Sequence, residues 1–328
     1  MASTVFGGPG PLFLLLLALV VDAAAGDWIG RVLPDPARLS ARVCALLDRR
    51  LNRPERGEGA RLMRGALVVL LLVAVAAGIG LIAEWFRVNA RSGWVVEFVV
   101  LLACLRGRSA WMRVREVRRA LESRGLTAAQ GEVEGLTRRH AYGLDEHGVA
   151  RAAIEHAAKA LDRKLVAPAF WYILLGAPGV LAWAAVDGAD AALGHAGVRH
   201  ERFGQTAARL DDALNAIPAR LTALLLALAA PFLGTASLGG AFRAMAADAR
   251  KHPSFNMGWP IAATAGALGL SLGGPHRDGA VTIHEPWIGS GRARATPPDV
   301  GRALGLTALA ALLLLLLVGA LTAGVAAI

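Results

Sequence analysis

The sequence predicts an all-α polytopic integral membrane protein with about five to seven transmembrane or re-entrant helices. Its 328 residues are 55% hydrophobic and only 18% charged, and the mean hydropathy is +0.48. Soluble globular proteins carry about 25% charged residues. The apolar residues also gather in runs that approach or exceed the roughly 20 residues a helix needs to cross a hydrocarbon core. We therefore expect membrane helices joined by amphipathic helical loops.

Seven apolar segments follow one another along the chain. The second, fifth and seventh contain no charged residue and are the clearest spans. The third is short and includes Glu97. The fourth and sixth are interrupted by or rich in small residues, so each either spans the membrane or re-enters it. The predicted segments of this single membrane domain, 1–328, are 5–26, 65–83, 94–105, 166–186, 221–242, 259–274 and 303–325.

The first segment resembles a secretory signal, because an alanine-rich stretch follows its apolar run. No lysine or arginine precedes that run, so the basic region of a signal peptide is missing. We expect an uncleaved first span. Asp22, near its end, is expensive to expose to lipid and is predicted to face protein or water.

Basic residues are concentrated in two connections, and the formal net charge is +10. The stretch 27–64 carries nine arginines, and 106–165 carries eleven arginines and two lysines. Such loops are typical of the cytoplasmic side of a membrane. The second reads as an amphipathic helical region, and without an aromatic and basic module it predicts no nucleic-acid partner. The stretch 187–220 has four arginines and five carboxylates, so charge leaves its side open.

Common catalytic and metal-binding motifs are absent. None of the three lysines is placed for a phosphate-binding loop, and Cys44 and Cys104 have no ligand spacing. His195 and His200 lie five apart in a polar stretch, where a hydrogen-bonded pair is more common than a metal site. No protein-bound metal or prosthetic group is predicted.

Three polar clusters flank the spans, at 187–220, 248–260 and 273–289. Arg–Asp pairs, asparagine caps and Pro or Gly turns can simply fix loops. If the clusters share one face, they instead form an active site at the membrane surface. Arginines and Lys251 could then hold phosphate oxygens, while carboxylates hold Mg²⁺ or orient an amine.

Ordered blocks over almost the whole chain resemble the CobD/CbiB family of the cobalamin pathway, the adenosylcobinamide-phosphate synthases. The early blocks lead through Gly26-Asp27, Gly143–Glu146 and Val166–Trp171. The strongest blocks are Arg202-Phe203-Gly204, Ala207–Asp212, Ile217–Thr222, Asp248–Ser254, Gly258-Trp259-Pro260, Gly273–Pro275 and Glu285–Gly289.

The resemblance implies an amide-forming enzyme of vitamin B12 assembly. Such an enzyme joins aminopropanol, or its phosphate, to adenosylcobyric acid with consumption of ATP, and Mg²⁺ is implied with it. The ATP would activate the propionate carboxylate as an acyl phosphate. The expected partners are these substrates, membrane lipid and other cobalamin-pathway proteins. The expected location is the bacterial cytoplasmic (inner) membrane, with several passes.

The resemblance also implies which residues form the site. Carboxylates and neighbouring polar groups would deprotonate the amine, and cations would neutralise phosphate. The implied catalytic residues are Glu155, Asp190, Arg202, Asp211, Asp212 and Asn215. The implied substrate- or phosphate-binding residues are Arg139, Arg220, Lys251, His252, Asn256 and Trp259.

The chain departs from the family pattern at several motifs. Family members usually carry Glu-Asn-x-x-Asp where this chain has Lys159 to Arg163, so two carboxylates have become cations. They usually read Arg-Asp-Thr at 139–141 and Asn-Thr-x-Asp at 187–190, where this chain differs. These losses leave an alternative open: a non-catalytic membrane paralogue, a scaffold or regulatory subunit. A small transporter has less support, because no inverted repeat is visible.

Overall fold

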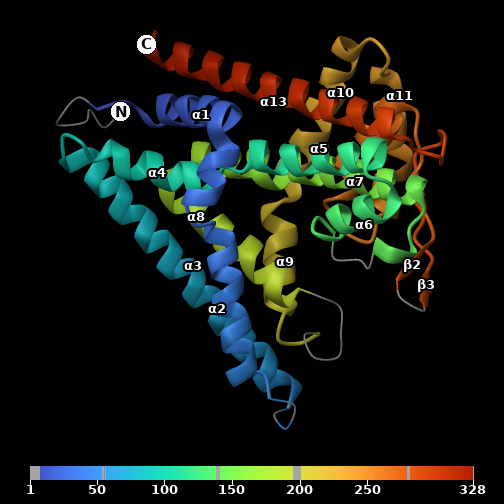
Figure 1. The fold of residues 1–328 in the computed structure, drawn as a ribbon. Helices are drawn as coiled ribbons and strands as arrows, with labels where there is room; N and C mark the ends of the chain where they lie inside the picture. The colour runs from blue at the N-terminus through green and yellow to red at the C-terminus, as the bar shows by residue number, and fades with distance from the viewer. Residues whose placement is uncertain are drawn as a thin grey trace. The chain divides into compact units, whose positions relative to one another are not determined.

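The computed structural model describes residues 8–53, 55, 57–137, 141–194, 201–278 and 281–327 (Figure 1). The chain divides into two compact units, each described by itself. Unit 1 comprises Met1–Arg106, Ala167–Asn215 and Val318–Ile328. Unit 2 comprises Gly107–Val166 and Ala216–Leu317.

The regular elements in the described residues of unit 1 are all helices. Its helices are α1 (Pro11–Val32), α2 (Pro36–Leu51), α3 (Glu58–Asn89), α4 (Trp94–Cys104), α8 (Ala167–Leu193) and α9 (Gln205–Leu214). Unit 2 contains α5 (Gly107–Ser123), α6 (Leu126–Glu134), α7 (Glu146–Leu161), α10 (Ala216–Ala229), α11 (Leu238–Asp248), α12 (Gly258–Leu268) and most of α13 (Pro297–Ala326). It also contains 3₁₀ turns at Ala141–Gly143, Ala230–Leu233 and Ala249–Lys251, and a π-helical turn at Asp162–Val166.

The predicted all-α polytopic membrane fold is confirmed. Among the described residues, five helical runs are long and apolar enough to cross a membrane: Pro11–Leu51, Glu58–Asn89, Glu146–Leu193, Ala216–Leu233 and Pro297–Ala326. Strands are very short. β1 (Leu272–Gly273) pairs with β4 (Trp287–Ile288), and β2 (His276–Asp278) pairs with β3 (Val281–Ile283), both antiparallel.

Three helix ends differ from the apolar segments read from the sequence. Helix α8 continues to Leu193, so Asp187 and Asp190 lie on its last turns rather than in a loop. Segment 221–242 is divided because α10 gives way to a 3₁₀ turn containing Pro231. Proline removes an amide donor from the helical ladder and its ring clashes with the preceding turn. Helix α12 ends at Leu268 before β1 begins.

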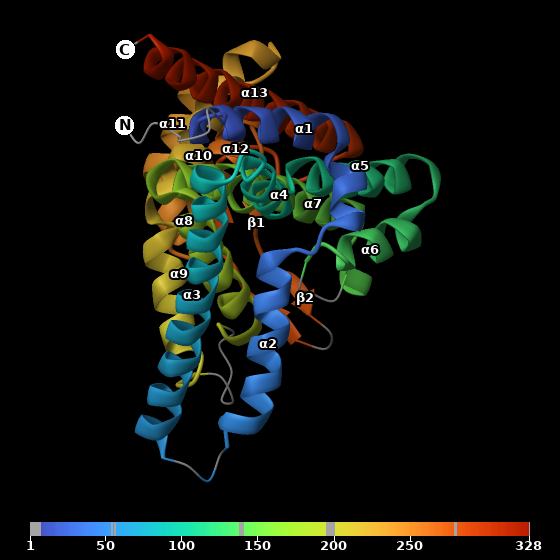
Figure 2. The same ribbon diagram turned by 90° about the vertical axis from the view of Figure 1, so that its left-hand side faces the viewer.

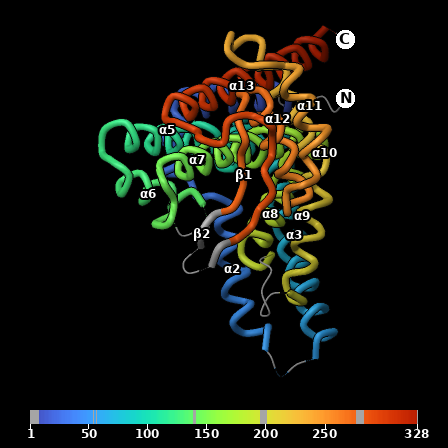
Figure 3. Tube along the Cα trace, turned by 90° about the vertical axis from the view of Figure 1, so that its right-hand side faces the viewer, coloured from blue at the N-terminus to red at the C-terminus, as the bar shows by residue number. Residues whose placement is uncertain are grey.

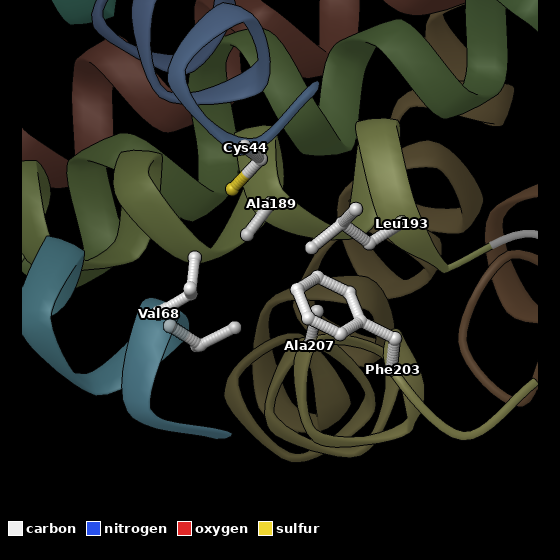
Figure 4. Close-up of a cluster of buried hydrophobic side chains, with 7 residues drawn as sticks. Cys44, Val68, Ala189, Leu193, Phe203 and Ala207 are labelled. Carbon is white, nitrogen blue, oxygen red and sulfur yellow. The ribbon is translucent and has the colours of Figure 1, made fainter. Parts of the chain in front are cut away.

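The core of unit 1 forms where α2, α3 and α9 pack on α8. Figure 2 shows α2 and α3 running antiparallel to one another. Figure 4 shows the side chains that meet there: Cys44, Val68, Ala189, Leu193, Phe203 and Ala207. Ser40 on α2 donates a 2.7 Å hydrogen bond to the carbonyl of Ala185, so α2 is also held by a buried polar contact.

Helix α8 is broken at Gly176, where φ is +63° and ψ is −153°. This left-handed conformation is readily adopted only by glycine. Beside the break, Arg87 forms a 2.7 Å ion pair with Glu97, which accepts a 2.6 Å hydrogen bond from Tyr172. All three side chains are buried, so this network joins α3, α4 and the first half of α8. Glu97 therefore faces protein, as its charge requires in an apolar segment.

Unit 2 packs three short helices, α10, α11 and α12, side by side (Figure 3). Helix α7 packs against α5 and α12. Trp111 on α5 donates a 3.1 Å hydrogen bond to the carbonyl of Leu304 on α13. The β1–β4 pair contacts α7, α11 and α12, which places this glycine-containing ribbon beside the polar residues described below.

Candidate functional site

The residues expected in the site are distributed over both units of the chain. Asp190, Arg202, Asp211, Asp212 and Asn215 belong to unit 1. Glu155, Arg220, Lys251, His252, Asn256 and Trp259 belong to unit 2. Arg139, His195 and His200 lie outside the described residues.

A buried hydrogen-bonded group, the Asn215 cluster, contains Trp183, Asp211 and Asn215. The Asn215 side-chain nitrogen donates to Asp211 Oδ1 and to the Asp211 carbonyl, both at 2.9 Å. Its side-chain oxygen accepts a 3.0 Å hydrogen bond from Trp183 Nε1. Asn215 is fully buried and Asp211 is 4% exposed. The carboxamide thus uses both of its ends to join the C-terminal end of α9 to α8.

A second tryptophan reinforces this junction. Trp171 Nε1 donates a 3.1 Å hydrogen bond to the carbonyl of Leu214, the last residue of α9. The last carbonyls of a helix have no partner within it, so such a donor stabilises the end of α9. The local architecture around Asp211 and Asn215 is therefore that of a fixed helix joint.

The remaining unit 1 candidates lie more openly. Asp190 and Asp212 are half-buried, on the last turns of α8 and on α9. Arg202 forms a 2.9 Å ion pair with Glu58 in the first turn of α3, and both side chains are largely exposed. Exposed pairs of this kind contribute about 0–1 kcal/mol to stability. Arg202 is therefore directed to a surface contact rather than to the Asn215 cluster.

In unit 2, a cationic group stands between aromatic rings. The Arg220 cluster comprises Arg220, Arg250, Phe255, Asn256 and Trp259. The Arg220 guanidinium carbon lies 4.7 Å from the Trp259 ring centroid and 5.0 Å from that of Phe255. Cation–π contacts of this length are attractive and fix the plane of the guanidinium.

The hydrogen bonds of Arg220 leave much of its donor capacity unused. Its Nη1 donates to the carbonyl of Ala216 at 2.5 Å and makes a long, 3.5 Å contact to Asn256 Oδ1. Within the described ranges, neither Arg220 nor Arg250 has a carboxylate partner. Arg250 is exposed and close enough to Arg220 for their like charges to act on each other. Two adjacent unneutralised cations favour an anionic ligand.

Next to this cluster, Asp248 ties a 3₁₀ turn to the β-ribbon. Its Oδ1 accepts a 2.5 Å hydrogen bond from Lys251, and its Oδ2 accepts a 2.8 Å hydrogen bond from the backbone N–H of Gly289. Burial raises the pKa of the Asp248 carboxyl, but the contacts with Lys251 and Gly289 outweigh it and hold the pKa below its usual value. His252 turns inward on its own loop, where its Nδ1 accepts from the Ser254 N–H at 2.9 Å.

Glu155 on α7 holds the other strand of the same ribbon. Its Oε1 accepts a 2.8 Å hydrogen bond from the backbone N–H of Gly273 in β1. Its Oε2 lies 3.9 Å from Lys159 Nζ and accepts no hydrogen bond from the described part of the chain. The carboxylate is buried and is fixed to the ribbon through its other oxygen.

The two cations at the altered family motif face carboxylates of the same helix region. Lys159 pairs with Glu155, and Arg163 Nε lies 4.0 Å from Asp162 Oδ2. Asp162 is fully buried and accepts a 2.8 Å hydrogen bond from Thr222 Oγ1. Lysine and arginine thus stand beside carboxylates that a divalent cation would otherwise bind.

Several site residues could not be found from motif spacing. Trp183 holds Asn215 from 32 positions away in sequence, and Phe255 covers Arg220 from 35 positions away. Phe255 nonetheless carries a signal, because a ring that is 59% exposed beside an arginine is available to a ligand. Asp248 belongs to the second polar cluster of the sequence, and in the structure its carboxylate accepts a hydrogen bond from the backbone of the ribbon.

Comparison with known proteins gives a consistent result. A family model described as CobD/Cbib protein matches residues 15–307. A relative from Sinorhizobium sp, called cobalamin biosynthesis protein CobD, is 38% identical over 294 residues, which cover 88% of this chain and 91% of the relative. Relatives of the same name from Brucella suis biovar 1 and Rhodobacter capsulatus are 37% and 34% identical, each covering 89% of this chain and 91% of the relative. No solved structure shows a significant match.

Proposed function

Because the chain belongs to the CobD/CbiB family, we propose that it acts in cobalamin biosynthesis and forms an amide between adenosylcobyric acid and aminopropanol or its phosphate. The reaction requires an activated propionate carboxylate and a deprotonated amine. The enzyme would work in the inner membrane of a bacterium, as a multi-pass protein, with these two substrates, membrane lipid and other proteins of the pathway as its partners.

The observation that carries this proposal is the Arg220 cluster. Both the propionate carboxylate and every phosphate group involved are anions. The Arg220 guanidinium is in contact with the rings of both Phe255 and Trp259, and Arg250 lies nearby, so cationic donors are positioned for oxygen ligands. Donors fixed before the reaction stabilise developing negative charge without reorganisation. The exposed Phe255 ring offers an apolar surface to the corrinoid beside those donors.

Glu155 is our candidate for accepting the proton of the ammonium group. Its Oε1 is fixed by Gly273 N–H, which holds the carboxylate in one orientation. Its Oε2 has the lone pairs needed to take a proton, and Lys159 at 3.9 Å would stabilise the charged carboxylate before the transfer. Asp248 and Lys251 would act as positioning residues, since they hold the turn that carries Arg250 against the ribbon.

ATP fits this arrangement as a substrate because its phosphates match the unneutralised cations of unit 2. Its role would be to phosphorylate the propionate carboxylate and make it an acyl donor. Mg²⁺ fits less well as a protein-bound ion, because Lys159 already stands beside the available oxygen of Glu155. Across the described residues, no three His, Cys, Asp or Glu side chains gather around one point. We propose that Mg²⁺ is carried by the nucleotide phosphates, and we derive no step through it.

We assign Asp211 and Asn215 a positioning role within unit 1. Every polar end of Asn215 is used by Trp183 and Asp211, which leaves it poorly suited to bind a substrate directly. Asp190 and Asp212, which are half-buried, remain the unit 1 carboxylates that a ligand could reach.

The alternative, a non-catalytic paralogue, is less well supported. Relatives that match over 88% and 89% of this chain are named cobalamin biosynthesis protein CobD, and the Arg220 cluster offers cationic donors to an anionic substrate, which together favour the enzyme. The altered motif at Lys159 and Arg163 bears on metal binding, whereas the Arg220 cluster does not depend on it.

Complementation tests the proposal. The chain would be expressed in a bacterium that lacks its own synthase and is supplied with cobyric acid, and cobinamide would be measured. We expect product from the wild type and a large loss in R220Q. R119Q is the matched control, because it removes one arginine charge from an exposed ion pair with Glu116 elsewhere in unit 2. A wild-type protein that is inserted in the membrane, supplied with pathway partners and still inactive would overturn the enzyme assignment.

A further inference from the structure

Helix α5 combines one tryptophan with two arginines on a single face. Trp111 lies between Arg108, about one turn before it, and Arg115, about one turn after it. The guanidinium carbons of the two arginines are 5.3 Å and 5.9 Å from the centre of the Trp111 ring. Residues three and four positions apart lie on the same face of a helix. The three side chains, all half-buried, therefore form one stripe, which we call the Trp111 stripe.

Two contacts place this stripe at the polar end of α13. Trp111 Nε1 donates a 3.1 Å hydrogen bond to the carbonyl of Leu304, and a Cβ at Gly301 would lie 2.7 Å from Nη1 of Arg118. Figures 1 and 3 show α5 beside the first turns of α13. Helix α13 is long and apolar enough to cross a membrane, and its last charged residue is Arg302. The stripe thus lies where polar residues give way to the apolar span, the level at which tryptophan and arginine side chains meet lipid headgroups.

Both glutamates of α5 are paired with other arginines of the same helix. Glu122 forms a 2.8 Å ion pair with Arg118, and Glu116 forms a 2.7 Å ion pair with Arg119. Arg115 has no carboxylate partner in the part of the chain that the structure describes. Its positive charge is therefore not balanced by the acidic residues of its own helix.

Arg115 also keeps hydrogen-bond donors that a ligand can use. Its Nη1 lies 3.9 Å from the sulfur of Met112, which is a weak acceptor, and the Trp111 ring carries no net charge. A guanidinium has five N–H donors, and its bonds to phosphate oxygens are charge-assisted. Arg108 makes a further interaction of its own, so only the charge of Arg115 is counted as available.

We propose that the Trp111 stripe binds the headgroup of an anionic phospholipid. Arg115 donates hydrogen bonds to the phosphate oxygens, while the indole of Trp111 packs against the glycerol and the first part of the acyl chains. Basic residues beside the end of a membrane helix favour anionic lipids. A choline headgroup fits less well, because its quaternary ammonium would meet the two arginines that already contact the ring. This site does not depend on the amide-forming reaction.

The test compares two lipids bound to the full-length protein. The protein is placed in nanodiscs with equal amounts of phosphatidylglycerol and phosphatidylcholine of the same acyl chains, then transferred to a mild detergent. The lipids that remain bound are quantified by mass spectrometry. We expect the wild type to retain phosphatidylglycerol preferentially, and R115Q to lose about fivefold of that preference. R119Q is the matched control, because it removes an arginine of the same helix that is already paired with Glu116 and should keep the wild-type ratio.

Two further measurements keep the proposal testable if R115Q fails to fold. R115K keeps the charge and should retain most of the preference, and transfer of the wild type at high salt should reduce it, because salt screens the attraction. Equal retention of the two lipids by the wild type, or a ratio for folded R115Q within twofold of the wild type, would overturn the proposal. Displacement of phosphatidylglycerol by inorganic phosphate at constant ionic strength would also overturn it, by assigning the stripe to a soluble anion. No readout involves turnover, so the outcome is separate from that of the complementation experiment.

Discussion

Each unit of the molecule contains a fully buried asparagine next to charged residues, yet the two are used differently. Asn215 in unit 1 is held at both ends of its carboxamide, by Trp183 and by Asp211. Asn256 in unit 2 meets Arg220 only at 3.5 Å, and the arginine is held mainly by two aromatic rings. The first arrangement consumes its polar groups internally, whereas the second leaves guanidinium donors available.

This difference distinguishes a joint from a binding site even though both are polar and buried. In the Asn215 cluster, removal of any member exposes a buried partner, so the expected consequence is loss of stability. In the Arg220 cluster, two adjacent cations without a carboxylate partner among the described residues keep donors that an anion can use. Mutations should therefore affect stability in one unit and activity in the other.

The largest effect is expected for N215A. The change removes the Asn215 hydrogen bonds from the buried Asp211 carboxylate and the buried Trp183 N–H, which should lower the free energy of unfolding by about 3 kcal/mol. Unfolding in detergent, followed by circular dichroism, measures this loss. N89A is the matched control, because Asn89 is also in unit 1 but makes one exposed hydrogen bond, and its effect should stay within about 0.5 kcal/mol. A stable N215A protein that has lost only activity would reverse the assignment of the two units.

The second prediction concerns R220Q, which should retain its stability and lose activity about 100-fold, equivalent to about 2.7 kcal/mol of transition-state stabilisation. R220K should recover part of the loss, since it keeps the charge but not the planar group between Phe255 and Trp259. Initial rates of cobinamide formation at several concentrations of each substrate check this. Equal losses of activity in R220Q and R220K would show that the rate depends on the planar guanidinium and not on its charge alone. An unchanged rate in R220Q would show that Arg220 is not part of the site.

The sequence identifies most of the fold but not how the polar residues are used. Hydropathy locates α1, α3 and α13, because long apolar runs leave few alternatives to membrane helices. Hydropathy ends α8 too early, because Asp187 and Asp190 are typical of a loop. The helix nevertheless continues to Leu193, where it packs against α2 and α9. Helix propensity and charge predict the ends of helices only weakly, because tertiary packing can outweigh both.

The sequence names candidate site residues but not the contacts that these residues make. The resemblance implies roles for Asn215 and Arg220, but their partners Trp183, Phe255 and Trp259 are distant from them in sequence. A spacing rule works only where neighbours share one helix, as for Lys159 and Glu155. Nor does any local pattern predict the π-helical turn, whose first residue, Asp162, forms a buried hydrogen bond with the distant Thr222.

The third prediction tests how tightly unit 1 is joined. A Cβ at residue 188 would collide with the carbonyl oxygen of Ala37 and with the Ser40 side chain, so G188A should push α2 away from α8. We expect a loss of about 2 kcal/mol in the free energy of unfolding, in the range of overpacked cores. G78A is the control, because a Cβ there meets nothing within 4 Å, and alanine favours the helix. If G188A and G78A have the same free energy of unfolding, the close packing of α2 on α8 does not contribute to the stability of unit 1.

The smallest effect is expected for D248N, and it should depend on pH. The folded-state pKa of Asp248 is below its value in the unfolded chain, so its ionised form stabilises the fold above the unfolded pKa. That contribution is lost as the pH falls through the folded-state pKa, when the carboxylate takes up a proton and its bonds with Lys251 and Gly289 weaken. At pH 7, D248N should be less stable by about 1 kcal/mol, and the difference from the wild type should shrink at acid pH. Thermal unfolding of both proteins from pH 7 down to the lowest pH at which they remain soluble measures this. A difference that stays constant over that range would mean that the amide loses packing rather than charge, and that the turn carrying Arg250 is not held by an ionised Asp248.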